Sequence, residues 1–216
     1  MIETRGLTFG YGTGPLIVQD LDLDLGPGPM TGLVGRSGSG KSTLLYLLGL
    51  MVTATAGSLR IDAVETTDLP DWARADLRAR SMGFVFQDAL LDPARSVLDN
   101  VLEGTLYGAT PPRQARTRAL DLLERFGVEV DPWRRPGQIS GGQAQRVALC
   151  RAFVGAPRIV LADEPSGNLD DQSADVVWGA LRERAEAGAV VVVATHDRVR
   201  SSLCDQIVEV GHAAAS

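Results

Sequence analysis

The sequence is poor in cysteine and lacks an excess of basic residues. Its two cysteines, Cys150 and Cys204, stand in apolar or helical contexts and match no metal-ligand spacing. We therefore interpret them as reduced, buried thiols of a cytosolic protein. Acidic residues outnumber basic ones by 27 to 21, which gives a net charge of −6. This balance argues against a surface that coats nucleic acid.

Long apolar runs and targeting segments are also lacking. The longest apolar runs, around residues 44–52 and 189–194, are far shorter than the ~20 residues that span a membrane. The N-terminus does not have the basic-then-apolar layout of a signal peptide. A role at a membrane would therefore require another chain to supply the span.

The sequence does contain a glycine-rich segment between two apolar runs, which predicts a strand over 30–34, a turn, and a helix over 42–51. The segment fits G-x-x-x-x-G-K-[ST], in which backbone N–H groups wrap the β-phosphate of a nucleotide. Lys41 would neutralise the β- and γ-phosphate oxygens, and the Ser42 hydroxyl would bind Mg²⁺. A flexible glycine turn is the alternative. The predicted phosphate-binding residues are Gly35, Arg36, Ser37, Gly38, Ser39, Gly40, Lys41, Ser42 and Thr43.

The apolar patterns predict an α/β fold in one domain. Helices are expected over 71–80, with Trp72, Ala73 and Leu77 facing inward, and over 171–187. The last three strands are almost continuously apolar, which is typical of a parallel sheet buried on both faces. We expect a mainly helical subdomain over 88–157, inserted into a nucleotide-binding core with a β subdomain that comprises 1–87 and 158–216. The predicted strands are 2–9, 16–25, 30–34, 59–61, 84–86, 159–162, 190–194 and 207–210.

Two adjacent carboxylates, Asp163 and Glu164, follow the strand over 159–162, at the strand end where ligands collect in open α/β sheets. Neighbouring side chains of a strand point in different directions, so the two can have different functions. We predict that Asp163 belongs to the Mg²⁺ shell and that Glu164 orients and deprotonates an attacking water. Two acidic residues in an ordinary loop are the alternative.

A second helix start that carries glycines is predicted at residues 139–146, where Ser140 fits the position of an N-cap. The free N–H groups at this start would form a second anion site. A helix that is merely capped is the alternative. The chain therefore has two predicted phosphate-binding helix starts but one phosphate loop.

The sequence resembles the ATP-binding cassette (ABC) ATPases over essentially its whole length, because five features occur in the order and at the approximate spacing of that family. They are Gln87 after FVF, ISGGQ, IVLADEP, SGNLD and His196 in VATHD. The resemblance implies that two cassettes, a second copy of this chain or a paralogous cassette, stack head to tail around two ATP molecules. Each ATP would lie between the phosphate loop of one cassette and the second helix start of the other, which accounts for the unequal number of anion sites. That helix start would bind ATP through Ser140, Gly141, Gly142 and Gln143.

The resemblance also implies roles for single residues. Tyr11 would stack on adenine, Gln87 would sense Mg²⁺ and the attacking water, and His196 would contact the γ-phosphate, while residues 166–170 would cross the dimer interface. Without the resemblance, Tyr11 also fits an ordinary turn aromatic and His196 a strand cap. His212 belongs to a terminal tail that we expect to be unstructured.

Within the family, GNLD after ADEP and the run FVFQDALLDPARSVLDNV look like the group that pairs with macrolide-exporter, lipoprotein-release and cell-division membrane subunits. This implies an ATPase at the cytoplasmic face of the cell membrane that drives a separate integral membrane permease, for efflux or for lipoprotein or lipid extraction. The permease would contact the segment from Asp88 to Val101. The sequence departs from the group at Ala144, where a longer polar residue is usual, at Ser166, which replaces a threonine, and in the unusually acidic run 88–93.

Three other functions are alternatives to the transporter subunit. An ATPase that regulates a membrane enzyme, as the cell-division branch suggests, would have the same site residues. A soluble cassette that acts on the ribosome or on nucleic acid is disfavoured, because the chain has one cassette, no basic tract and only a compact segment between Lys41 and Ser140. A GTPase is disfavoured because no N-K-x-D motif is present.

Overall fold

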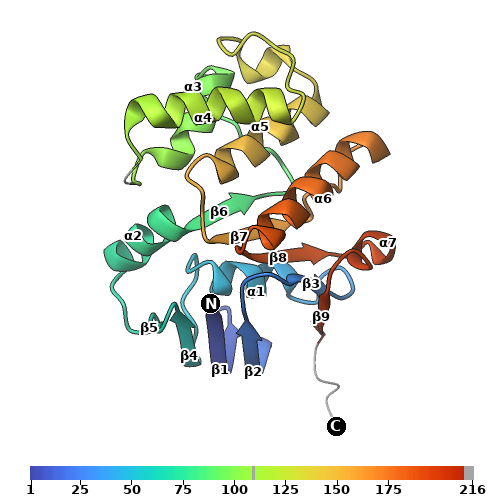
Figure 1. The fold of residues 1–216 in the computed structure, drawn as a ribbon. Helices are drawn as coiled ribbons and strands as arrows, with labels where there is room; N and C mark the ends of the chain where they lie inside the picture. The colour runs from blue at the N-terminus through green and yellow to red at the C-terminus, as the bar shows by residue number, and fades with distance from the viewer. Residues whose placement is uncertain (109, 212–216) are drawn as a thin grey trace.

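A computed structural model describes residues 1–108 and 110–211 of the chain. These residues form two β-sheets with helices packed on them (Figure 1). His212, for which we predicted an unstructured tail, lies outside the described residues.

The central sheet has five parallel strands in the order β6-β7-β8-β3-β9. This arrangement confirms the parallel sheet that the apolar strands predict. β3, which leads into the glycine-rich segment, lies between β8 and β9, so that segment starts from the interior of the sheet. The strands are β3 (Met30–Val34), β6 (Met82–Val85), β7 (Ile159–Asp163), β8 (Val190–Thr195) and β9 (Gln206–Glu209).

The two faces of this sheet belong to two separate apolar cores. Val160 and Ala162 of β7 pack into a core with α5 (Gly141–Phe153) and α6 (Asp171–Glu186). Ile159 and Leu161, which alternate with them, pack into a core with α1 (Lys41–Leu48). Consequently α1 and α5, the two helices with predicted anion-binding starts, lie on opposite faces of the sheet (Figure 1).

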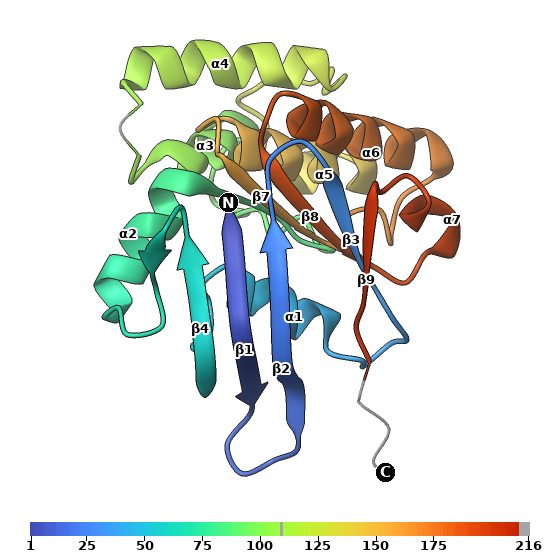
Figure 2. The same ribbon diagram turned by 60° about the horizontal axis from the view of Figure 1, so that its bottom comes forward.

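The N-terminal part of the chain forms a four-stranded antiparallel sheet in the order β2-β1-β4-β5, which Figure 2 shows beside α1. Apolar and acidic residues alternate at the end of β2, and Leu25 is buried while Asp22 and Asp24 are exposed. The strands are β1 (Ile2–Gly10), β2 (Leu16–Leu25), β4 (Ala56–Ile61) and β5 (Val64–Glu65).

Helices dominate the segment between β6 and β7. They pack on one another at the end of the molecule remote from the antiparallel sheet (Figure 1). They are α3 (Val97–Leu102), α4 (Pro112–Arg125) and α5, with short 3₁₀ turns at Glu103–Thr105 and Pro136–Gln138. Among the described residues, no helix is long and apolar enough to cross a membrane.

Three local expectations were wrong. Trp72 of α2 (Asp71–Ser81) does not face inward: its side chain is 75% exposed, because α2 packs on β6 through the face that carries Ala73 and Leu77. Cys204 is half-buried and not buried like Cys150. The first helix ends at Leu48 and not at residue 51, because Leu50 adopts a positive φ of 58° that ends the helical path.

Candidate active site

The loop between β3 and α1 needs glycine for two different reasons. Gly38 and Gly40 have φ values of 77° and 97°, a region that favours glycine, and Gly40 is the N-cap of α1. A Cβ on Gly40 would also lie 2.5 Å from Cγ2 of Ile17. At Gly35 the reason is packing, because a Cβ would lie 2.2 Å from the Val210 carbonyl oxygen. The loop is therefore closely packed against its neighbours.

Lys41, the only lysine in the sequence, closes this loop. Its side chain is largely buried, and Nζ donates to the carbonyl oxygens of Gly35 at 3.0 Å and Arg36 at 3.2 Å. The first N–H groups of α1 have no intrahelical acceptor. An ammonium group beside a free helix N-terminus favours a polyphosphate at this position.

Asp163 at the end of β7 accepts hydrogen bonds on both oxygens from α1. The Ser42 hydroxyl donates to Oδ1 at 2.9 Å and the Tyr46 hydroxyl donates to Oδ2 at 2.9 Å. Burial, followed by the hydrogen bond to Asp163, raises the pKa of Tyr46 to about 12. The phenol thus remains a donor at neutral pH, and the buried Asp163 is held beside Ser42.

Glu164 turns away from Asp163 and pairs with groups at the end of β8. Its Oε1 lies 2.7 Å from Nδ1 of His196, and Oε2 accepts from the Thr195 hydroxyl at 3.1 Å. Its backbone has a positive φ of 44°, so β7 ends before it. The two carboxylates therefore diverge because of this turn, and not because of strand pleating as the sequence suggested. Strained backbone of this kind is concentrated at functional sites.

Gln145 of α5 joins two segments that carry predicted site residues. Its Nε2 donates to the carbonyl oxygens of Phe86 at 2.7 Å and Pro165 at 3.2 Å, and the side chain is buried. The first acceptor precedes Gln87 and the second follows Glu164. Gln87 itself is exposed and lies beside the turn after Glu164, since a Cβ on Gly167 would be 3.5 Å from its Nε2.

Ser140 is the N-cap of α5, as the sequence predicts. Its Oγ accepts from the Gln143 N–H at 3.2 Å, and Oε1 of Gln143 accepts from the Ser140 N–H at 2.9 Å. This reciprocal capping box engages the Gln143 side chain. Within the described part of the chain, no hydrogen bond joins residues 140–143 to the loop at 35–43. One chain therefore presents the two helix starts separately.

The start of α5 packs on the start of α6. A Cβ on Gly142 would lie 2.9 Å from Oγ of Ser173, so a larger residue at this position would displace the Ser173 hydroxyl. Asp170 caps α6 by accepting from the Ser173 N–H at 2.8 Å, and the hydrogen bonds from Ser173 lower the pKa of Asp170. Residues 166–170 are thus fixed next to the start of α5.

Tyr11 lies in the turn between β1 and β2. Its ring packs edge-on against Phe9, with 4.8 Å between the ring centroids, and 55% of the residue is exposed. More than half of the residue is therefore accessible to a ligand.

Tyr46, Gln145 and Thr195 were not identified from the sequence as site residues. Tyr46 carries a signal that was available, since it follows Ser42 by four residues and so shares its helix face. Gln145 and Thr195 carry no local signal, because their partners come from distant segments.

The sequence pattern of the family described as "ABC transporter" matches residues 18–167, which is more than half of the chain. With the fold and the site described above, this match defines an ABC-type ATPase cassette, and the chain belongs to the ABC transporter family.

Two curated relatives show the position of the chain within the family. The lipoprotein-releasing system ATP-binding protein LolD of Anaeromyxobacter dehalogenans (strain 2CP-C) is 43% identical over 220 residues, which cover 96% of this chain and 89% of that protein. The macrolide export ATP-binding/permease protein MacB of Nitrosomonas europaea (strain ATCC 19718 / CIP 103999 / KCTC 2705 / NBRC 14298) is 40% identical over 97% of this chain, but this chain spans only 32% of that protein.

The fold is also similar to a solved dimeric ATP-binding cassette in a post-hydrolysis state bound to ADP and Pi. The two are 33% identical, with a TM-score of 0.87, and the alignment covers 98% of this chain and 94% of that one. This likeness confirms the ABC ATPase fold.

Proposed function

We propose that this chain hydrolyses ATP with Glu164 as the general base and His196 at the γ-phosphate, and that it thereby drives a separate membrane permease. The observation that carries the proposal is the division of the adjacent carboxylates: Asp163 is bonded to Ser42 and Tyr46, whereas Glu164 is paired with His196 and Thr195. One acid is thus available for a metal ion and the other for a water proton. Tyr11 would stack on adenine.

The residues at the end of β7 suit Mg²⁺. Mg²⁺ prefers oxygen ligands and is commonly bound by one or two carboxylates together with substrate phosphates. The Ser42 hydroxyl and the Asp163 carboxylate lie 2.9 Å apart, and the Gln87 amide belongs to the neighbouring segment. In the described ranges no group of three His, Cys, Asp or Glu side chains forms an all-protein metal site, so we assign the remaining ligand positions to phosphate and water. The ion would neutralise the phosphate charge that develops during hydrolysis.

We infer that a second copy of the chain or a paralogous cassette completes each site. Residues 140–143 lie on a helix across the sheet from α1 and make no hydrogen bond to the loop at 35–43 in the same chain. The similar cassette noted above was solved as a dimer. In a head-to-tail pair, the start of α5 would reach the partner's nucleotide with its free N–H groups.

The segment between Asp88 and Val101 is proposed to hold the permease. Buried Asn100 fixes its shape by accepting from the Asp92 N–H at 2.7 Å and donating to the Ser96 carbonyl at 2.9 Å. Leu90 is 62% exposed at the rim of a cavity of about 610 Å³, which Phe84 and Tyr107 also line. An exposed apolar rim of this kind suits a protein partner.

Arg151 would couple this surface to the ATP site. Its guanidinium donates to the carbonyl oxygens of Ala89 and Leu90, both at 2.8 Å. Arg151 belongs to α5, the helix that begins at the predicted second anion site. Movement of α5 when two cassettes close would therefore pull directly on the permease-binding segment.

The relatives indicate the class of cargo. Because the chain is 43% identical to a lipoprotein-releasing ATPase and 40% identical to a macrolide exporter, we propose a hydrophobic or lipid-modified cargo that the permease handles at the membrane.

The test is a pull-down of tagged Glu164→Gln with ATP and Mg²⁺ from detergent-solubilised membranes of the native host. We expect a multi-span membrane protein. The matched control is Glu164→Gln combined with Leu90→Asp, which should bind ATP but lose the membrane protein. Recovery of only ribosomal or nucleic-acid-associated proteins would overturn the permease assignment.

A further inference from the structure

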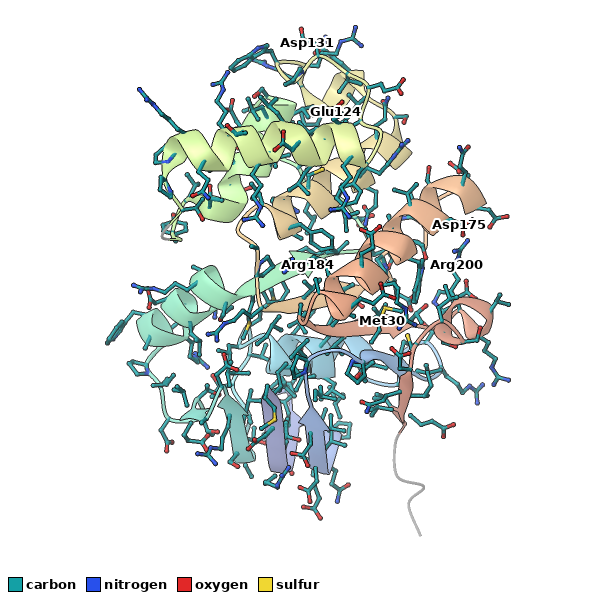
Figure 3. The ribbon with its side chains drawn as sticks, in the orientation of Figure 1. Met30, Glu124, Asp131, Asp175, Arg184 and Arg200 are labelled. Atoms are coloured by element: carbon teal, nitrogen blue, oxygen red, sulfur yellow. The ribbon has the colours of Figure 1, made fainter. Side chains whose placement is uncertain are left out.

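Arg200 links the segment that carries His196 to the first turns of α6. It belongs to α7 (Arg198–Ser201), and its guanidinium donates to Asp175 at 2.8 Å and to Asp171 at 3.3 Å. A third carboxylate, that of Asp197, lies 3.8 Å from its Nε. Only 14% of the Arg200 side chain is exposed, whereas both aspartates of α6 are largely exposed. Figure 3 shows Arg200 reaching from α7 toward Asp175.

The ion pair with Asp197, followed by hydrogen bonds, connects this guanidinium with Glu164. The Asp197 carboxylate caps α7 by accepting from the N–H groups of Val199 and Arg200. The Asp197 N–H donates to the Thr195 hydroxyl at 3.1 Å, and that hydroxyl donates to Glu164. These bonds tie the residues on either side of His196 to each other and to the first turn of α7.

On the α6 side, Arg200 binds close to the turn at 166–170. Asp171 is the first residue of α6 and follows the N-cap Asp170. Trp178 of α6 also contacts this turn, since its Nε1 donates to the Ser166 hydroxyl at 2.9 Å. Arg200 thus bridges the His196 segment and the turn that we propose to lie at the cassette interface.

Two arginines hold α7 and the residues just after it against α6: Arg200 itself, and Arg182 of α6, which donates to the Leu203 carbonyl two residues beyond α7. A helix of four residues is not stable by itself, and Val199 is 79% exposed. Among the described residues of α7, Arg200 is the one whose side chain hydrogen-bonds to α6. The hydroxyl of Ser201 instead donates to the Arg198 carbonyl within α7. His196 has a largely exposed imidazole, so its orientation depends on the segment that bears it.

We propose that Arg200 is a positioning residue for ATP hydrolysis, which keeps His196 directed at Glu164 by fixing α7 to α6. The proposal rests on the roles of Glu164 and His196 given above. A planar guanidinium suits this task because it bonds two carboxylates at once in a fixed geometry, which a lysine ammonium does not.

The test compares Arg200→Met and Arg200→Lys with the wild type in steady-state ATPase assays. We expect Arg200→Met to lower kcat by about tenfold to a hundredfold through misplacement of His196, while KM for ATP changes by less than about twofold. Arg200→Lys should recover part of the loss. The matched control is Arg5→Met, which breaks an exposed pair with Asp24 in the antiparallel sheet and should keep the wild-type rate.

A second readout follows His196 directly. The chain has two histidines, so ¹⁵N spectra of the rings, assigned with His212→Ala, isolate the Nδ1 resonance of His196. In Arg200→Met this resonance should move toward its position in Glu164→Ala, in which the pairing is absent. In Arg5→Met it should stay in place.

Wild-type kcat in Arg200→Met, or an unmoved Nδ1 resonance, would overturn the role of Arg200. If Glu164→Gln abolishes turnover while Arg200→Met does not affect it, the inference about Arg200 alone fails. If the wild-type protein does not hydrolyse ATP, the proposed function fails, and the resonance still tests whether Arg200 positions His196.

Discussion

Glu164 and His196 lie 2.7 Å apart between Oε1 and Nδ1, although 32 positions separate them in the sequence. Their proximity follows from the pairing of β7 with β8, which brings the ends of the two strands to the same edge of the sheet. The Thr195 hydroxyl holds the other carboxylate oxygen. Glu164 is therefore oriented before any substrate arrives, which is what a general base requires.

Ser140→Arg tests whether the site needs two chains. The substitution places bulk and positive charge at the start of α5, so ATP hydrolysis should fall by about 10²-fold or more while an isolated monomer still binds ATP. Equilibrium binding of a fluorescent ATP analogue and a phosphate-release assay measure the two properties. Ser140→Asn, which keeps a capping oxygen, is the control for loss of the N-cap. Loss of ATP binding by the Ser140→Arg monomer would refute the two-chain site.

Tyr46→Phe tests the support of Asp163. The change removes the donor to Oδ2 and leaves the ring in place, so Asp163 keeps only one of the two hydrogen bonds from α1 that orient its carboxylate. Because partners that orient a metal-binding carboxylate contribute about tenfold or more to affinity, the Mg²⁺ concentration for half-maximal ATPase activity should rise by about tenfold. Tyr107→Phe, at a residue that is 79% exposed, is the control. An unchanged Mg²⁺ dependence in Tyr46→Phe would rule out this role.

The Tyr46 phenol should also make stability depend on pH. Its pKa in the folded protein is raised from 10.0 to about 12, so the neutral form is favoured by folding. The resulting stabilisation should be complete below about pH 10 and should be lost as the pH rises toward about 12. Urea unfolding of the wild type and of Tyr46→Phe between about pH 8 and about pH 11.5, a range that spans the shift, measures how the difference in unfolding free energy changes with pH. A difference in unfolding free energy that stays constant across the range would contradict the prediction.

Gln145→Ala should separate the Gln87 segment from the turn after Glu164. It leaves the carbonyl oxygens of Phe86 and Pro165 without their donor in a buried place, which should cost about 1–3 kcal/mol of unfolding free energy. Turnover should fall as well, since Gln87 would lose its fixed position. Urea denaturation and ATPase assays measure both effects. The control, Gln114→Ala on the exposed side of α4, should change stability by no more than about 0.5 kcal/mol. If Gln114→Ala lost as much stability as Gln145→Ala, the loss in Gln145→Ala would not come from its hydrogen bonds to Phe86 and Pro165.

The sequence predicted most of the fold because apolar periodicity is a local signal. The strands over Ile159–Asp163 and Val190–Thr195 are continuous apolar runs, and the loop before Lys41 has a pattern that only a phosphate-binding turn requires. The prediction for Trp72 was wrong because an aromatic residue suggests an inward position. Only one side of α2 lies against β6, and Trp72 is on the exposed side.

The supporting residues of the site were harder to predict. Tyr46 bonds a residue 117 positions away, and Gln145 bonds one 59 positions away. Arg200 was equally unexpected, because its aspartate partners lie on another helix. Such pairs depend on how distant segments are placed, which local periodicity does not encode.

The most direct measurement is ATP turnover by purified wild-type protein and Glu164→Gln, together with light scattering of each in ATP and Mg²⁺. The wild type should hydrolyse ATP, while Glu164→Gln should bind ATP, hydrolyse it about 10²–10⁴-fold more slowly and accumulate as a dimer. Normal turnover in Glu164→Gln would remove Glu164 from the role of general base and contradict the assignment of the site.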